Sequence, residues 1–296
     1  MLHSLISILS RLPIRVLYWV ADRVLYPLIY YVVRYRRKVV AKNLLIAFPQ
    51  HTSSERNRIA RDFYHQFCYT IVEIIYGYRC SEGEMRERVV FENTEEVNRL
   101  VEQAGGGIFM LAHMGNWEWM ASIQQWLNSG ITEVNVYRTL KSQQMDQLML
   151  AIRAKRGGIC IEKRRILREM VRYRAEKKPI TVGLLSDQKT RPEVTKTWVP
   201  FMGQTVGFLE GGEVLGKKFN YPVFYAHITR TRRGYYRCVF HILSDSPTQT
   251  QGGEITAAYA RSLEANIYEQ PALWLWTHNR FKYCKKEKDQ GTKSKE

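Results

Sequence analysis

The stretch GGGIFMLAHMGNWEW, residues 105–119, decides both the fold and the chemistry. Its apolar run stops at His113, and Gly115 and Asn116 then offer a turn and a helix cap before WEWMASIQQWL. Within one helix, residues five apart point about 140° away from each other, so His113 must precede the helix if it is to meet Glu118. The sequence therefore predicts a strand, a histidine, a turn and a helix, with Glu118 in the first turn reaching back to the imidazole.

Segments with strand and helix patterns alternate along the rest of the chain. Four apolar segments are typical of strands, at 107–112, 132–138, 179–186 and 222–230. Helical spacing of apolar residues marks 53–78, capped by Ser53 or Ser54, and then 141–158, 162–178 and 254–270. The fourth strand is expected to turn through Arg233 and Gly234 into another strand. This alternation predicts one α/β domain with a central, mostly parallel or mixed sheet flanked by helices.

The position of His113 favours catalysis. The carboxyl end of a strand is where open α/β sheets form their ligand crevices. A carboxylate that accepts a hydrogen bond from one ring nitrogen fixes the tautomer, and the other nitrogen can then take a proton from a hydroxyl. Because the sequence has no Gly-x-Ser-x-Gly elbow and no cysteine in a comparable turn, a general base is favoured over a protein nucleophile. We interpret His113 and Glu118 as this pair; a structural histidine is the alternative.

The N-terminal region has the composition of a membrane anchor. Residues 16–33 are almost continuously apolar and aromatic, apart from Asp22, Arg23 and Pro27, and the basic segment 34–42 follows directly. No small-residue cleavage site follows, so we expect a helix over residues 1–33 that lies in or near the membrane interface, with a buried core helix as the alternative. The catalytic domain is expected over 34–283, and a basic, disordered tail over 284–296.

The charge of the chain points to anionic partners. Forty-five Lys and Arg residues against 28 Asp and Glu residues give a formal net charge of +17. Acidic lipid, a phosphorylated substrate or nucleic acid would each fit this charge, although no nucleic-acid-binding motif is recognisable and no nucleic acid partner is expected. The five dispersed cysteines indicate neither a disulfide framework nor a zinc site. No metal is expected, because the turn offers no further ligands beside His113 and Glu118.

Several short motifs carry a family resemblance. They are RRKVVAKNLLIAFP (36–49), HMGNWEW (113–119), VYRTLKSQQMDQLMLAIRAKRGG (136–158), LLSDQK (184–189), VPFMGQTV (199–206) and LWLWTHNRFK (273–282). In this order they resemble the bacterial lipid A late acyltransferases, of the glycerolipid acyltransferase group with its His-x-x-x-x-Asp/Glu motif, and the resemblance covers nearly all of the chain. Met202 stands where the family usually has a second aromatic residue. The Asp-Gln turn continues as KTRPEVTKTW, whereas the commoner continuation in the family contains glycine.

The resemblance implies an enzyme that needs no bound cofactor. It implies transfer of a fatty acyl group from an acyl carrier protein thioester, or less commonly acyl-CoA, to a hydroxyl of a lipid A precursor, a membrane glycolipid. The enzyme would lie on an anionic membrane surface, at the cytoplasmic face of the bacterial inner membrane. Related enzymes acylate amino-acid lipids or lysophospholipids, so these acceptors stay open. A non-enzymatic basic membrane or nucleic-acid-binding protein is the alternative from another class.

Four further residues are expected in the site. Arg138 is the expected stabiliser of the oxyanion that forms on the thioester. Asn116 is expected either to hold Arg138 in place or to hold the turn after His113. In the second case it would be a simple helix cap. The resemblance places Asp187 and Gln188 in a turn that faces the active site or the substrate, although both residues are common turn formers.

Overall fold

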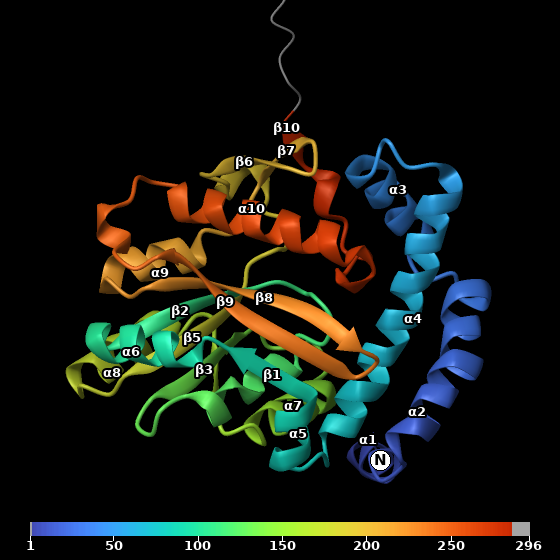
Figure 1. Ribbon diagram of the computed structural model, residues 1–296, viewed down its shortest axis with the longest axis horizontal. Coiled ribbons are helices and arrows are strands. Elements are labelled where there is room, and N and C mark those ends of the chain that lie inside the picture. The colour runs from blue at the N-terminus through green and yellow to red at the C-terminus, as the bar shows by residue number, and fades with distance from the viewer. Residues whose placement is uncertain (1, 286–296) are drawn as a thin grey trace, which may run out of the picture.

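A seven-stranded sheet with the order β1-β9-β8-β2-β5-β3-β4 runs through the protein in the computed structural model, which describes residues 2–285 (Figure 1). Strands β8 and β9 pair antiparallel, and the other neighbours in this sheet pair parallel. The predicted α/β class with a mostly parallel sheet is therefore confirmed.

The strands of the large sheet include the four that the sequence predicts. They are β1 Val89–Glu92, β2 Gly106–Leu111, β3 Thr132–Tyr137, β4 Ile159–Glu162, β5 Ile180–Leu185, β8 Val223–Arg232 and β9 Tyr235–Ser244. A second, three-stranded sheet is formed by β6 Trp198–Phe201, β7 Gln204–Gly207 and β10 Cys284–Lys285. The predicted turn through Arg233 and Gly234 joins β8 to β9 as a hairpin.

The α-helices are α1 Leu2–Leu9, α2 Ile14–Val20, α3 Arg37–Ala47, α4 Ser53–Gly77, α5 Glu82–Arg88, α6 Thr94–Ala104, α7 Gln143–Ala154, α8 Ile166–Ala175, α9 Gly211–Phe219 and α10 Glu254–Glu269. The segment after His113 forms a 3-10 helix, η3 Trp119–Trp126, instead of the expected α-helix. Helix α4 is capped by Thr52 in a capping box with Glu55, one residue before the predicted cap.

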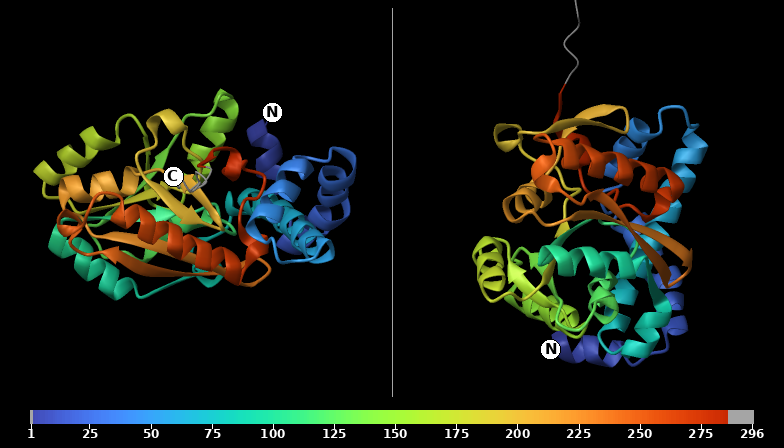
Figure 2. Two further views of the ribbon diagram at one scale, coloured as in Figure 1. Left: turned by 90° about the horizontal axis from the view of Figure 1, so that it is seen from above. Right: turned by 60° about the vertical axis from the view of Figure 1, so that its left-hand side comes forward.

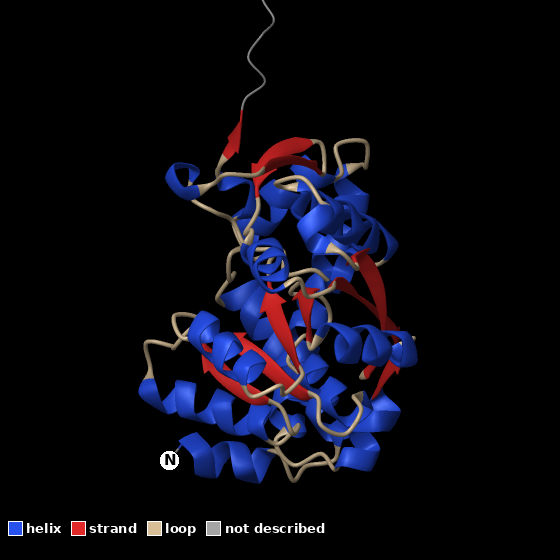
Figure 3. Ribbon diagram, turned by 90° about the vertical axis from the view of Figure 1, so that its left-hand side faces the viewer, coloured by secondary structure: helices blue, strands red, loops and turns tan. Residues whose placement is uncertain are grey.

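Helices cover both faces of the large sheet (Figure 3). Alternation along β2 sends Phe109 to one face and Met110 to the other. Helices α9 and α10 lie on the Met110 side, where Gly212 of α9 touches Met110 and Asn266 of α10 accepts a hydrogen bond from Tyr225 of β8. Helices α6 and α7 and η3 lie on the Phe109 side, where the functional cavity forms. The core consequently occupies both sides of the sheet.

The N-terminal region forms two helices where one was expected over residues 1–33. Helix α1 ends at Leu9, and a second helix runs from Ile14 to Val32, in which α2 is followed by two π-helical segments, Ala21–Leu25 and Leu28–Val32. This region packs along the long helix α4 at one end of the sheet (Figure 2). Leu17 and Tyr18 are buried in this contact, whereas Trp19 is 61% exposed. The region thus has one face in the core and one apolar face outside it.

Among residues 2–285, no single helix is both long enough and apolar enough to cross a membrane. Ile14–Val32 and Arg37–Ala47, which meet at 85°, pass the test of length and composition as a bent pair.

The first two residues of the expected disordered tail form a strand. Cys284 and Lys285, which were assigned to the tail, pair with β7 as β10. The rest of the predicted tail, 286–296, lies outside the described residues.

Candidate active site

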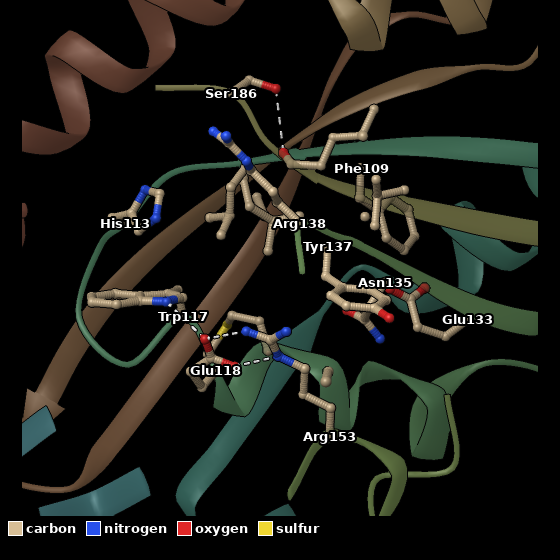
Figure 4. A pocket seen from close by; sticks show the side chains of 18 of the residues that line it. Phe109, His113, Trp117, Glu118, Glu133, Asn135, Tyr137, Arg138, Arg153 and Ser186 are labelled. Atoms are coloured by element: carbon tan, nitrogen blue, oxygen red, sulfur yellow. Dashed lines mark hydrogen bonds and ion pairs between the residues drawn. The ribbon is translucent and has the colours of Figure 1, made fainter. Parts of the chain in front are cut away.

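A cavity of about 450 Å³ opens at the carboxyl ends of the central strands (Figure 4). It runs from His113 along the face of the sheet that carries Phe109. Among its lining residues, the charged and polar ones are His113, Glu118, Glu133, Asn135, Arg138, Asp146, Arg153, Lys163, Ser186, Gln188 and Lys189. Apolar side chains form most of the inner wall, among them Phe91, Phe109, Met120, Ile123, Ala226 and Phe240. Such a cavity fits a long apolar group with a reactive polar end.

His113 is held at the cavity by Asp187. The Nδ1 atom of His113 lies 2.7 Å from Oδ1 of Asp187, and the backbone N–H of His113 donates to Oδ2 at 3.1 Å. The two residues follow β2 and β5, which are neighbours in the sheet, and so their side chains meet although 74 positions separate them. Because a carboxylate can only accept, the proton of a neutral His113 sits on Nδ1, and Nε2 is left as a hydrogen-bond acceptor.

The Asp187 carboxylate is itself fixed and ionised. The indole Nε1 of Trp274 donates to its Oδ2 at 2.9 Å. Burial opposes ionisation, but the charge of His113 and the hydrogen bonds from His113 and Trp274 outweigh it and lower the pKa of Asp187 to about 2. Burial lowers the pKa of His113, and the charge and hydrogen bond of Asp187 outweigh this effect, so that the pKa is raised. The arrangement is that of a general base with an orienting carboxylate.

Glu118 does not make the predicted hydrogen bond to His113. The turn directs its side chain toward α7, where Arg153 binds both carboxylate oxygens at 2.7 Å. The indole Nε1 of Trp117 donates to Oε1 at 3.2 Å, and the Trp117 ring packs beside the His113 ring with 5.0 Å between centroids. The prediction of a direct contact was wrong because Asp187 occupies the position at Nδ1. Glu118 instead anchors Arg153 in the cavity wall (Figure 4).

Asn116 lies behind the turn that follows His113 and does not line the cavity. Its Nδ2 donates to Oε2 of the fully buried Glu73 at 3.0 Å, and its Oδ1 accepts the backbone N–H of Trp119 at 3.3 Å. Tyr18 and Tyr236 also donate to Glu73. Of the two expected uses of Asn116, the structure therefore places it in the turn, with no contact to Arg138.

The mouth of the cavity is basic. Arg138, Lys163 and Lys189 line it, and within residues 2–285 none of the three is paired with a carboxylate. The Nε2 atom of Gln188 lies 3.5 Å from Nε2 of His113, at the edge of hydrogen-bonding distance. The structure thus brings Arg138 and Gln188 to the same cavity as His113, and it places Asp187 against His113 outside the cavity lining.

Two contributors to the site escape inspection of the sequence around His113. Trp274 comes from the segment before the C-terminus, and Arg153 comes from the helix α7. The motif LWLWTHNRFK marks the region of Trp274, but nothing in it indicates a bond to Asp187. The Asp-Gln turn after β5 was the available signal for the true partner of His113.

The comparison with known proteins yields one family. The family described as bacterial lipid A biosynthesis acyltransferase matches residues 3–283, which is nearly the whole chain. A search of curated proteins finds no match.

Proposed function

The chain belongs to the bacterial lipid A biosynthesis acyltransferase family, whose members transfer acyl groups, and we propose on this premise that it moves a fatty acyl chain from an acyl carrier protein thioester to a hydroxyl of a lipid A precursor. The observation that carries the proposal is the His113 and Asp187 pair at the mouth of a largely apolar cavity. The cavity supplies a place for the acyl chain, and the pair supplies a base for the hydroxyl.

In the proposed reaction, His113 Nε2 takes the proton of the acceptor hydroxyl as its oxygen attacks the thioester carbonyl. Asp187 stabilises the resulting imidazolium through Nδ1–H. When the tetrahedral intermediate collapses, the C–S bond breaks and the imidazolium returns its proton to the departing thiolate. The products are an ester and a free thiol, and His113 is again neutral. No bound cofactor and no covalent bond to the protein enter this scheme.

The oxyanion of the intermediate needs a donor. Arg138 follows β3, lines the cavity mouth and has no carboxylate partner in the described part of the chain, so its guanidinium is free to meet developing negative charge. Gln188 lies beside the reacting nitrogen of His113 and can position the acceptor hydroxyl. These assignments make Arg138 a catalytic residue and Gln188 a substrate-binding residue.

The donor and the acceptor are both anionic, which suits the basic mouth. Lys163 and Lys189 can attract the phosphates of a lipid A precursor or of the carrier's prosthetic group. Arg165 at the N-cap of α8 and Arg172 within α8 both pair with Glu169, so part of the positive charge of this segment is neutralised within the protein. We therefore assign the attraction of the acyl carrier protein to Lys163 and Lys189 at the cavity mouth.

The N-terminal region is proposed to hold the enzyme on the cytoplasmic face of the inner membrane. Its outer face exposes large apolar side chains, among them Ile8, Val16, Trp19, Val24, Leu28, Tyr31, Val32 and Val33. A patch of this composition suits the interface of a bilayer, and the basic residues 34–42 suit its anionic headgroups. Fixing the enzyme there would bring the acceptor lipid to the cavity mouth.

The test is an acyl transfer assay in membranes with a labelled acyl carrier protein thioester, with lipid products resolved by mass spectrometry. Lipid A precursors, lysophospholipids and amino-acid lipids are supplied as acceptors, and acyl-CoA is supplied as an alternative donor. Wild type is expected to add one acyl chain to the lipid A precursor, and His113→Ala is expected to add none. Transfer of one acyl chain to another acceptor, and not to the lipid A precursor, would support the proposed reaction but would contradict the proposed substrate.

His227→Ala provides a matched control. His227 also pairs with a carboxylate, Glu269, at 2.8 Å, but it lies outside the cavity lining. Its substitution removes a histidine and an acid contact without touching the site, so the activity should persist. Equal losses in His113→Ala and His227→Ala would reject His113 as the base.

A further inference from the structure

The inner end of the cavity contains a buried polar pair that the proposed mechanism does not use. Glu133 and Asn135 lie on β3, and alternation along this strand gives both the same face. Glu133 is only 2% exposed, and both residues line the cavity. In Figure 4 they lie beside Phe109 and Tyr137, at the side of the cavity away from His113. An acid and an amide are unexpected in a wall that only needs to hold a hydrocarbon chain.

The hydrogen bonds of this pair are incomplete. The Thr181 hydroxyl donates to Oε2 of Glu133, while Oε1 has no partner among the described residues. The Nδ2 atom of Asn135 is buried and likewise has no partner within residues 2–285. A Cβ atom placed on Gly183 would lie 3.1 Å from Glu133 Oε1 and 3.6 Å from Asn135 Oδ1, so both side chains flank the bare backbone of this glycine. Two oxygens that have no hydrogen-bond partner among the described residues, Oε1 of Glu133 and Oδ1 of Asn135, therefore flank one small space.

We propose that this end of the cavity recognises a hydroxyl group on the distal part of the acyl chain, with Glu133 and Asn135 as its hydrogen-bond partners. The hydroxyl proton goes to Oδ1 of Asn135, and the hydroxyl oxygen accepts from the acid O–H of Glu133, carried on Oε1 because Oε2 accepts from Thr181. This inference rests on the proposed function, because it takes the acyl chain as the occupant of the cavity.

The position of the pair sets where on the chain the hydroxyl lies. Asn135 and Phe109 both lie opposite Gly183, and Phe109 lies four residues before His113. At about 3.3 Å per residue, Asn135 is therefore roughly 13 Å from His113 along the strands. Glu133 lies opposite Thr181, one pleat deeper, at roughly 20 Å by the same rise. An extended hydrocarbon advances about 1.3 Å per carbon, given C–C bonds of about 1.5 Å, so the hydroxyl falls at roughly the tenth to the fifteenth carbon.

The charge state of Glu133 suits a neutral ligand. Burial raises the pKa of Glu133 to about 8, against the hydrogen bond from Thr181, so the side chain is mostly a neutral acid at pH 7. A neutral acid and an amide match an alcohol, whereas a cation or an anion would remain uncompensated in this apolar surrounding. The backbone of Glu133 is fixed as well, since its N–H donates to Oε1 of Gln124 from η3 at 2.6 Å.

The test compares two carrier thioesters of equal length, tetradecanoyl and its counterpart with a hydroxyl on the twelfth carbon. Wild type is expected to use the hydroxylated chain with about tenfold higher kcat/KM, as one well-formed net hydrogen bond allows. Glu133→Leu and Asn135→Leu should each remove the preference, and Glu133→Gln, which keeps a donor, should retain part of it. Ile123→Val changes an apolar residue of the same cavity and should alter both rates alike.

A binding measurement separates this proposal from the proposed function. Calorimetry with free tetradecanoic acid and its twelfth-carbon hydroxyl derivative should show the same preference without any transfer. Transfer without a preference in either assay would overturn the hydroxyl site and leave the acyltransferase reaction intact. Preferential binding without transfer would support the hydroxyl site and overturn the proposed acyltransferase reaction. Failure of both fatty acids to bind would overturn the cavity as the acyl site. If Glu133→Leu folds poorly, Asn135→Leu supplies the same comparison.

Discussion

Replacing Asp187 by asparagine tests which carboxylate orients the catalytic base. The substitution keeps the size of the side chain but removes the charge beside Nδ1 of His113. The pKa of Asp187 is lowered from 3.8 to about 2, and at 1.36 kcal/mol per unit this is a stabilisation of the ionised pair by about 2 to 3 kcal/mol. If the imidazolium formed in the reaction receives this stabilisation, Asp187→Asn should lower kcat/KM by roughly 30- to 150-fold.

The pH profile provides a second readout of the same variant. Neutral His113 is the active form in the proposed reaction, so the rate should rise as the pH increases through the pKa of His113. Asp187 raises that pKa in the wild type, and its removal should therefore move the rising limb to lower pH while the plateau falls. Glu118→Gln is the matched comparison, because Glu118 acts on His113 only through its charge and should shift the limb less.

The assay is steady-state transfer from a carrier thioester across a pH series, with both variants checked for a folded thermal transition. A nearly unchanged rate in Asp187→Asn together with a large loss in Glu118→Gln would refute this reasoning. It would mean that the hydrogen bond to Asp187 is replaced by one to Glu118 during turnover.

Three further predictions concern the walls of the cavity. Wild type should lose about 3 kcal/mol of unfolding free energy relative to Glu133→Gln as the pH rises from 5 to 8. The reason is that Glu133 ionises near pH 4.5 in the unfolded chain and only near pH 8 in the folded chain. A difference in unfolding free energy that stays constant over this pH range, measured by denaturation, would contradict the prediction. Arg153→Ala should lower the unfolding free energy by about 3 kcal/mol, since it leaves Glu118 buried without its partner, and adding Glu118→Gln should recover part of the loss in the same denaturation experiment. Gly183→Ala should shift the enzyme toward shorter acyl chains, because the new methyl group enters the space at Glu133; an unaltered chain-length series would exclude this part of the cavity as the acyl site.

The sequence predicts the sheet better than it predicts the site. Strand-like segments such as ITVGLL are short and bounded by turn residues, and the alternation with helices correctly indicates a mostly parallel sheet. Such patterns do not determine the order of the strands in the sheet, so they do not predict that β2 and β5 are neighbours. The spacing of His113 and Glu118 suggested a local partner, whereas the observed partner, Asp187, comes from the neighbouring strand.

The N-terminal region shows a similar limit. Its composition indicates an apolar, aromatic segment, and the structure confirms that large apolar side chains are exposed there. Which face of the helix Ile14–Val32 is buried depends on its packing against α4 and on the buried Glu73, which accepts a hydrogen bond from Tyr18. Such tertiary contacts are invisible in a single sequence.

The long-range assembly of the base has a consequence for the chain as it is synthesised. His113 is held by Asp187, and Asp187 is held in turn by Trp274, 87 residues further along the chain. Until the segment that carries Trp274 has been synthesised and has docked, a nascent chain has no fixed carboxylate beside His113, although the HMGNWEW turn is already present. If His113 is the base of the proposed reaction, a chain that stops before Trp274 should not carry out that reaction.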